Sequence, residues 1–183
     1  MSKQHQTDSH ILVEAPLGAT QGLLHFQGCS FPCALGRSGI AMEKREGDGV
    51  TPTGIFAMRA LRYRRDRVPA PQSELPTQAL KPEDGWCDAP NDPAYNQPVT
   101  LPYAASHETL WREDHLYDIV IMLGYNDDPV VPGNGSAIFF HLAKQKDGLL
   151  QPTEGCVALA LSDMLEVLKG VTPRTMMEIR LSA

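Results

Sequence analysis

The sequence predicts a mainly β fold, a β sandwich or open barrel with one or two short helices. Short apolar or alternating runs are separated by segments rich in turn-forming residues, which is typical of strands joined by turns. Helical patterns occur only in two short stretches. The 183 residues suffice for one sizeable core. We therefore expect a single domain over residues 11–183, preceded by a flexible polar terminus at residues 1–10.

The first elements form a hairpin. Residues 11–13 and 23–26 are predicted strands on either side of a turn at 16–22. Another turn follows at 36–39. Within it, Arg37 can recognise a carboxylate of a ligand, because guanidinium suits planar bidentate binding, or it can be an ordinary surface arginine.

The next segment, residues 44–54, reads KREGDGVTPTG and is too dense in turn formers to be a helix or a central strand. Gly47 and Gly49 permit positive φ, while the carboxylate of Asp48 can accept backbone N–H groups. A phosphate-binding P-loop is excluded because no Gly-Lys-Ser/Thr follows. We expect this segment to support the wall of a site, with direct contact to a ligand as the second option.

Residues 55–61 then resume a strand, and 69–102 form a long stretch rich in proline and turn residues. A connection of this length is predicted to wrap the domain or to form part of a site. Trp86, Tyr95 and Asn96 are candidates to line a cleft; alternatively, Trp86 and Tyr95 anchor this loop on the core. A short helix started by Ser106 is expected at 106–112.

The strongest predicted strand is residues 116–126, whose almost unbroken apolar run indicates a central position. Tyr125 emerges at its end, and whether it reaches the site depends on the strand register. After a turn at 127–135, the apolar run 137–140 is a short strand that delivers His141 to its end.

Polar residues follow His141 until Cys156 opens a second apolar run, 157–161, which brings a thiol back towards the imidazole. A thiol has an ordinary pKa of about 8.5, so cysteine acyl transfer needs a base to take its proton. The thiolate is then the nucleophile, and the imidazolium protonates the leaving amine. A substrate carbonyl can approach the backbone at Gly155, and the N–H groups of Gly155 and Cys156 are candidate oxyanion donors.

A structural explanation exists for each residue of this pair. A cysteine in an apolar stretch is commonly a small core residue, and a histidine at a strand end is commonly a hydrogen-bonded structural residue. Beyond Cys156, Ser162 is predicted to cap a helix at 163–169 that Gly170 closes, and a last strand is expected at 175–181.

The other cysteines, Cys29, Cys33 and Cys87, are expected to be neither disulfide-bonded nor zinc-binding. The pair Cys29 and Cys33 has no matching second pair of ligands, so small buried residues are the simpler explanation. We therefore predict no metal and no cofactor.

Composition limits the partners. A net charge of −6 without a basic stripe argues against nucleic acid. No window approaches a membrane span of about 20 apolar residues. The first 18 residues contain no apolar stretch of signal-peptide length, so a cytoplasmic location is expected.

Two separated motifs resemble one family. His141, the 14 residues after it and the turn Thr153-Glu154-Gly155-Cys156 resemble the signature of the YkuD-type L,D-transpeptidases, a His followed by a Ser/Thr-x-Gly-Cys turn. The upstream segment 44–54 resembles that family's Gly-Asp-Gly and Thr-Pro-x-Gly segment. The resemblance spans about residues 23–179. The turn departs from the more usual family pattern in carrying Glu154 before the Gly-Cys and Ala158 after it.

The resemblance implies a mostly β domain that attacks the bond between the third residue of a peptidoglycan stem peptide and the following D-amino acid. Cys156 would hold the acyl group as a thioester, with His141 as base and then acid. The residues predicted to contact the substrate, a stem peptide or muropeptide fragment, are Thr153, Glu154, Arg37, Trp86 and Tyr125.

Together with the expected location, the resemblance favours a hydrolytic enzyme, an L,D-carboxypeptidase that releases terminal D-alanine from tetrapeptide stems during peptidoglycan recycling. The alternative is an L,D-transpeptidase that forms cell-wall cross-links. A second alternative is a non-catalytic module that binds peptidoglycan fragments.

Overall fold

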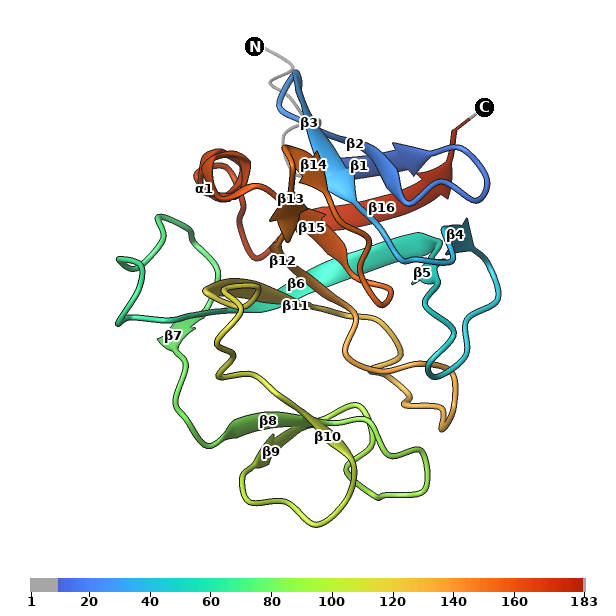
Figure 1. Cartoon of the computed structure of the whole chain (residues 1–183), viewed down its shortest axis with the longest axis vertical. Coiled ribbons are helices and arrows are strands. Elements are labelled where there is room, and N and C mark those ends of the chain that lie inside the picture. The colour runs from blue at the N-terminus through green and yellow to red at the C-terminus, as the bar shows by residue number, and fades with distance from the viewer. Residues whose placement is uncertain (1–9, 183) are drawn as a thin grey trace, which may run out of the picture.

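The computed structural model describes residues 10–182, and its main element is a β barrel (Figure 1). Around the barrel the strands are β11 (Ile119–Leu123), β12 (Phe139–Leu142), β15 (Val157–Leu159), β3 (Cys29–Ala34), β2 (Gln21–Phe26), β1 (His10–Ala15), β16 (Met176–Leu181) and β6 (Gly54–Tyr63), with β7 (Thr77–Ala79) beside β6. Strand β11 pairs with both β12 and β6, which closes the ring. The predicted mainly β, barrel-like fold is confirmed.

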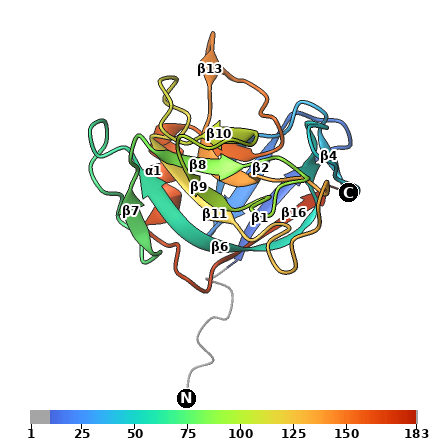
Figure 2. The same cartoon turned by 90° about the horizontal axis from the view of Figure 1, so that it is seen from below.

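Smaller elements surround the barrel. They are a three-stranded sheet of β10 (His107–Thr109), β8 (Asp84–Cys87) and β9 (Pro98–Thr100), the pairs β4 (Ile40–Ala41) with β5 (Thr51–Pro52) and β13 (Gln145–Lys146) with β14 (Leu149–Leu150), and the helix α1 (Leu161–Leu168). Figure 1 shows the three-stranded sheet as a separate layer below the barrel, and Figure 2 shows β13 projecting away from the body of the domain. Within residues 10–182, no helix has the length and apolar character needed to cross a membrane.

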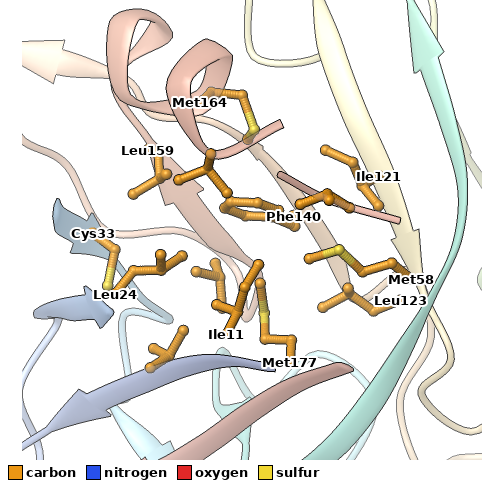
Figure 3. Close-up of a cluster of buried hydrophobic side chains, with 14 of the residues drawn as sticks. Ile11, Leu24, Cys33, Met58, Ile121, Leu123, Phe140, Leu159, Met164 and Met177 are labelled. Carbon is orange, nitrogen blue, oxygen red and sulfur yellow. The ribbon is translucent and has the colours of Figure 1, made fainter. Parts of the chain in front are cut away.

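Apolar side chains fill the barrel interior. Ile11, Leu24, Met58 and Phe140 from four different strands point towards one another in Figure 3. Helix α1 closes this core with Met164, which is fully buried. Packing of this kind stabilises the fold mainly by removing apolar surface from water.

A second apolar cluster lies between the outer face of β11 and β12 and the three-stranded sheet. Its buried members are Leu80, Leu110, Tyr117, Val120, Met122, Phe139 and Cys156. Alternate residues of β11 therefore serve two cores, since Ile119, Ile121 and Leu123 face the barrel interior. This explains why the strand is apolar throughout, and its predicted central position is confirmed by pairing on both edges.

The helix predicted at 106–112 is wrong. His107–Thr109 form strand β10, which pairs antiparallel with β8. Seven residues are too few for a stable helix in isolation, and pairing with a neighbouring strand outweighs a weak helical tendency. The stretch 69–102 also holds three short strands, so it is more ordered than the predicted loop.

Four local predictions need correction. The strand predicted at 137–140 is β12, Phe139–Leu142, so His141 lies inside the strand and not after its end. Helix α1 begins at Leu161, and its cap residue, Ala160, makes no side-chain hydrogen bond, so Ser162 is inside the helix. All four cysteines are free, but Cys29 is exposed because it starts β3 at the tip of a hairpin, whereas Cys33 is buried. His10 belongs to β1, while the rest of the predicted flexible terminus, residues 1–9, lies outside the described residues.

Candidate active site

His141 and Cys156 lie on the same outer face of the barrel. Strands β12 and β15 run parallel, and His141 is paired with Ala158. Cys156 precedes Ala158 by two residues, and residues two apart on an extended chain point to the same side. The sulfur accordingly lies beside Phe139, whose backbone N–H donates to Sγ at 3.3 Å.

Both side chains line one cleft of about 980 Å³. The cleft is lined by the turn before Cys156, by Lys44, Glu46 and Gly47, and by β10 and the segment after it. Besides His141 and Cys156, the charged and titratable residues along the cleft are Lys44, Glu46, Asp88, His107, Glu108, Arg112, Glu113, Asp114, Tyr117, Lys144 and Glu154. Acidic groups outnumber basic ones, so the cleft carries negative charge.

The imidazole of His141 is buried and held in one tautomer. Its Nδ1 donates a hydrogen bond to the carbonyl oxygen of Leu142 at 2.8 Å, which leaves Nε2 as the acceptor. The ring of Tyr117 packs edge-on against it, with centroids 5.1 Å apart. Burial lowers the pKa of His141 to about 4, against the opposing effect of the Leu142 carbonyl. The histidine is therefore neutral at pH 7 and able to accept a proton.

The thiol of Cys156 is also neutral at rest. Burial, and then the charge of Glu108, raise its pKa to about 12, while the Phe139 N–H lowers it. The S–H group donates to the carbonyl oxygen of Ala137 at 3.3 Å. The geometry therefore corresponds to a thiol and an imidazole rather than a preformed thiolate and imidazolium pair, so proton transfer would accompany attack on a substrate.

Thr153 organises the turn that carries the thiol. Its hydroxyl donates to the carbonyl oxygen of Cys156 at 2.7 Å and accepts from the N–H of Gly155 at 3.1 Å. The second bond means that the Gly155 N–H is occupied, so this arrangement does not provide the predicted oxyanion donor at Gly155. Gly155 has φ 139°, and a Cβ there would lie 2.7 Å from the carbonyl oxygen of Val50. Position 155 therefore requires glycine, both for the backbone conformation of the turn and for the close packing against Val50.

The segment 44–54 packs behind this turn. The carboxylate of Asp48 accepts from the N–H groups of Arg45 and Val50, at 2.6 and 2.9 Å, and from the ammonium of Lys44. Burial alone would raise the pKa of Asp48, but these hydrogen bonds together lower it. Gly47 and Gly49 have the positive φ that the sequence predicts. These contacts agree with a supporting role for the segment.

The predicted substrate contacts divide into two groups. Thr153 and Glu154 line the cleft, and Glu154 is largely exposed there. Arg37 is not part of the lining, because its guanidinium is held by Glu154 at 2.7 Å and by the carbonyl of Gly47. Trp86 and Tyr125 line a different, smaller cavity of about 250 Å³.

Trp86 and Tyr125 are each held by the fold. Trp86 packs edge-on against Phe139 and donates to Asn96, so it anchors the loop, which was one of its two predicted roles. Tyr125 packs against Phe56 and donates to the carbonyl of Asn134. Whether Tyr125 reaches the cleft depends on the strand register, which is set by tertiary contacts and not by local sequence. Within residues 10–182, no group of three or more His, Cys, Asp or Glu side chains is arranged as a metal site requires.

The cleft also contains residues that sequence patterns did not single out. The hydroxyl of Tyr117 donates to Glu108 at 2.6 Å, and Arg112 bonds the same carboxylate at 3.2 Å. Burial raises the pKa of Glu108, although Tyr117 and Arg112 oppose this. The spacing of Glu108 and Arg112 is also common on solvated helices, so only the folded structure shows that they face His141 and Cys156.

Comparison with known proteins shows which family the chain resembles. The family model of the L,D-transpeptidase catalytic domain, YkuD, matches residues 27–179. Curated protein sequences give no significant match. Similar solved structures include an L,D-transpeptidase from Mycobacterium smegmatis (12% identity, TM-score 0.43, covering 93% of this chain and 58% of that one). Two from Mycobacterium tuberculosis are L,D-transpeptidase 1 (13%, 0.39, 94% and 62%) and L,D-transpeptidase 3 (11%, 0.42, 93% and 60%).

This chain spans about three fifths of the length of those solved chains. The family model, by contrast, covers most of this chain and includes both the segment 44–54 and the pair His141 and Cys156. The chain therefore belongs to the YkuD family of L,D-transpeptidase catalytic domains.

Proposed function

We propose that the protein transfers the acyl group of peptidoglycan stem tetrapeptides at the L,D bond through a thioester on Cys156, and that water is the usual acceptor. The observation that carries this proposal is the parallel register of β12 and β15, which puts a neutral imidazole and a thiol on one face and in one cleft. Family membership supports the substrate class. The product would be a tripeptide stem and free D-alanine.

In the acylation step, Sγ of Cys156 attacks the carbonyl carbon of the third stem residue. The S–H proton passes to Nε2 of His141, which is unprotonated because Nδ1 carries the proton held by Leu142. The carbonyl π electrons move onto oxygen, and the N–H of Cys156 is the remaining backbone donor of the predicted oxyanion pair. When the C–N bond breaks, the imidazolium returns the proton to the amine of D-alanine.

In the deacylation step, a water molecule attacks the thioester carbonyl and gives one proton to His141. The C–S bond breaks, the sulfur recovers that proton from His141, and the tripeptide leaves as a carboxylic acid, which loses the second proton of the water to solvent. If an amine of a second stem peptide replaces water, the same steps give a cross-link. The choice between hydrolysis and cross-linking thus depends on which nucleophile reaches the thioester.

The proposal includes a cytoplasmic location, where the enzyme would act on stem fragments returned from the cell wall. Fractionation of the native organism with an antibody against the chain tests it. Recovery in the cytoplasmic fraction is expected, and recovery outside the cytoplasmic membrane would favour cross-linking.

The decisive experiment incubates the purified protein with a tetrapeptide stem and identifies the products by mass spectrometry. Tripeptide and D-alanine are expected, together with an acyl adduct on Cys156 in rapidly quenched samples. A cross-linked dimer as the main product would show that the acceptor is an amine of a second stem peptide and not water. Binding of the stem without any turnover would support a non-catalytic module.

Variants separate catalysis from folding in the same assay. Cys156→Ala should abolish turnover while leaving stem binding intact, and Cys29→Ala is the matched control because Cys29 is an exposed thiol on β3. His141→Gln should lower the acylation rate by roughly a hundredfold or more, the usual contribution of a general base. Turnover by Cys156→Ala at the rate of the unaltered protein would refute the mechanism.

A further inference from the structure

Asn96 makes the full set of hydrogen bonds that its amide allows. The residue is 4% exposed, and its Oδ1 accepts from the indole N–H of Trp86 at 2.9 Å and from the backbone N–H of Ala137 at 3.0 Å. Its Nδ2 donates to the carbonyl oxygens of Tyr125 and Asn126 at 3.0 and 2.8 Å. Two acceptor and two donor positions are thereby filled, which fixes the amide in the fold.

One of these bonds reaches a strained part of the backbone. Ala137 has φ 52°, a left-handed conformation that residues other than glycine seldom adopt. The hydrogen bond from its N–H to Asn96 helps hold it there. In this conformation the Ala137 carbonyl oxygen accepts the S–H of Cys156 at 3.3 Å. The path from Asn96 to the sulfur therefore consists of two hydrogen bonds and the backbone of one residue, Ala137.

We propose that Asn96 is a positioning residue, which holds Ala137 in its left-handed conformation so that the Ala137 carbonyl aims and retains the thiol of Cys156. Asn96 itself lines the smaller cavity behind the site and does not line the cleft, so it acts only through Ala137. The proposal rests on Cys156 being the nucleophile of the proposed function.

The sulfur also interacts with other groups, and these are unchanged by a substitution at Asn96. The titratable or charged residues in the same cleft, on the elements packed around Cys156, are Lys44, Glu46, Asp88, His107, Glu108, Arg112, Glu113, Asp114, Tyr117, His141, Lys144 and Glu154. Because this set is common to all variants, a change in thiol reactivity at constant pH reports the loss of the Ala137 acceptor.

The test uses Asn96→Gly, since glycine removes the side chain and tolerates the φ of 56° at this position. Asn134→Gly is the matched control, an exposed asparagine in the loop that leads to Ala137. The third protein is the double variant Asn96→Gly/Ala137→Gly, in which glycine adopts the left-handed conformation without help. Each is treated with iodoacetamide at pH 8, and labelling of every cysteine is followed by mass spectrometry.

A hydrogen bond to the protonated thiol disfavours the thiolate, so its loss should speed alkylation. We expect Asn96→Gly to raise the rate at Cys156 relative to exposed Cys29 by about 3- to 10-fold, the range that one neutral hydrogen bond permits. In the tetrapeptide assay kcat should fall about tenfold with KM little changed, because the sulfur is no longer held in the orientation needed for attack. The double variant should recover a large part of both effects, and Asn134→Gly should resemble the unaltered protein.

Buried Cys33 reports whether each variant is folded, because it should remain unlabelled. With Cys33 unlabelled, an unchanged ratio of Cys156 to Cys29 labelling in Asn96→Gly overturns the proposal. So does an equal change in Asn134→Gly, or a double variant no better than the single one. If the unaltered protein does not cleave tetrapeptides, the proposed function fails while the alkylation result still tests Asn96.

If Asn96→Gly is unfolded, amide hydrogen exchange in the unaltered protein tests whether Asn96 holds Ala137. The Ala137 N–H is expected to exchange far more slowly than that of exposed Asn134. Equal exchange rates would show that Asn96 does not hold Ala137 and would overturn the proposal.

Discussion

Nδ1 of His141 donates a hydrogen bond to the carbonyl oxygen of the next residue, Leu142, at 2.8 Å. The acceptor is backbone, so the orientation of the ring does not depend on a carboxylate. The bond selects the tautomer in which Nε2 can accept a proton, and burial keeps the ring neutral.

Stability should depend on pH through His141. The pKa of this residue is lowered to about 4 in the folded protein from an ordinary value of 6.5, so between these values the unfolded chain binds a proton that the folded chain does not. Stability is therefore lost as pH falls through this window, by about 3 kcal/mol at most. We expect urea unfolding to show a smaller acid loss for His141→Asn than for the unaltered protein between pH 7 and 4.

The control for this prediction is His25→Asn, which removes a half-exposed histidine on β2. It should leave the acid loss of stability in place. Equal pH dependence of the unaltered protein and His141→Asn would contradict the neutral, buried state of His141.

Thiol reactivity should follow the resting state of Cys156. Burial raises its pKa to about 12, with the charge of Glu108 as the second cause, and its side chain is nearly inaccessible. Iodoacetamide at pH 7.5 should therefore label exposed Cys29 before Cys156 in the free protein. Glu108→Gln removes the charge that opposes the thiolate and should speed labelling of Cys156 several-fold, by about 0.5 to 1 kcal/mol of differential stabilisation.

Mass spectrometry of the digested protein measures both rates at once. Labelling of Cys156 ahead of Cys29 would show that a thiolate already exists in the free protein. A slower reaction of Cys156 in Glu108→Gln would contradict the electrostatic role of Glu108.

Gly155→Ala should destabilise the protein by about 2 kcal/mol or more. The residue has φ 139°, and the added Cβ would lie 2.7 Å from the Val50 carbonyl oxygen. Gly148→Ala is the matched control, because Gly148 also has positive φ, 78°, but nothing lies within 4 Å of its Cβ position. Its cost should be about 1 kcal/mol from the backbone alone. Chemical denaturation measures both, and equal costs would show that packing against Val50 is unimportant.

Asp48→Asn should lower stability by about 2 to 4 kcal/mol, because it leaves the nearly inaccessible ammonium of Lys44 without its charge partner. Glu14→Gln, which breaks a more exposed pair with Arg180, should cost less than about 1 kcal/mol. The folded-state pKa of Asp48 is lowered, so its contribution is present above the ordinary value of 3.8 and disappears as pH falls through the lower folded value. Thermal unfolding at pH 7 compares the two variants, and equal losses would contradict the supporting role of the loop.

Local patterns in the sequence were sufficient for the fold class and for several strands. The apolar run that forms β11 is buried on both faces. Such a strand can be predicted from the sequence, because burial on both faces requires an apolar residue at each position. The glycines at 47 and 49 likewise follow from backbone conformation alone. Local sequence does not predict the strand at 107–109, because it exists only through pairing with β8, a partner about 20 residues away.

The sequence by itself determined that an imidazole and a thiol occur beside two apolar strand segments, in an order that matches one family of L,D-transpeptidase catalytic domains. Only the tertiary structure decided which other groups meet them. Tyr117 and Glu108 reach the cleft, while Trp86 and Tyr125 lie in a separate cavity. The reason is physical: side-chain direction along a strand is a local property with a period of two, whereas strand register depends on contacts between residues far apart in the chain.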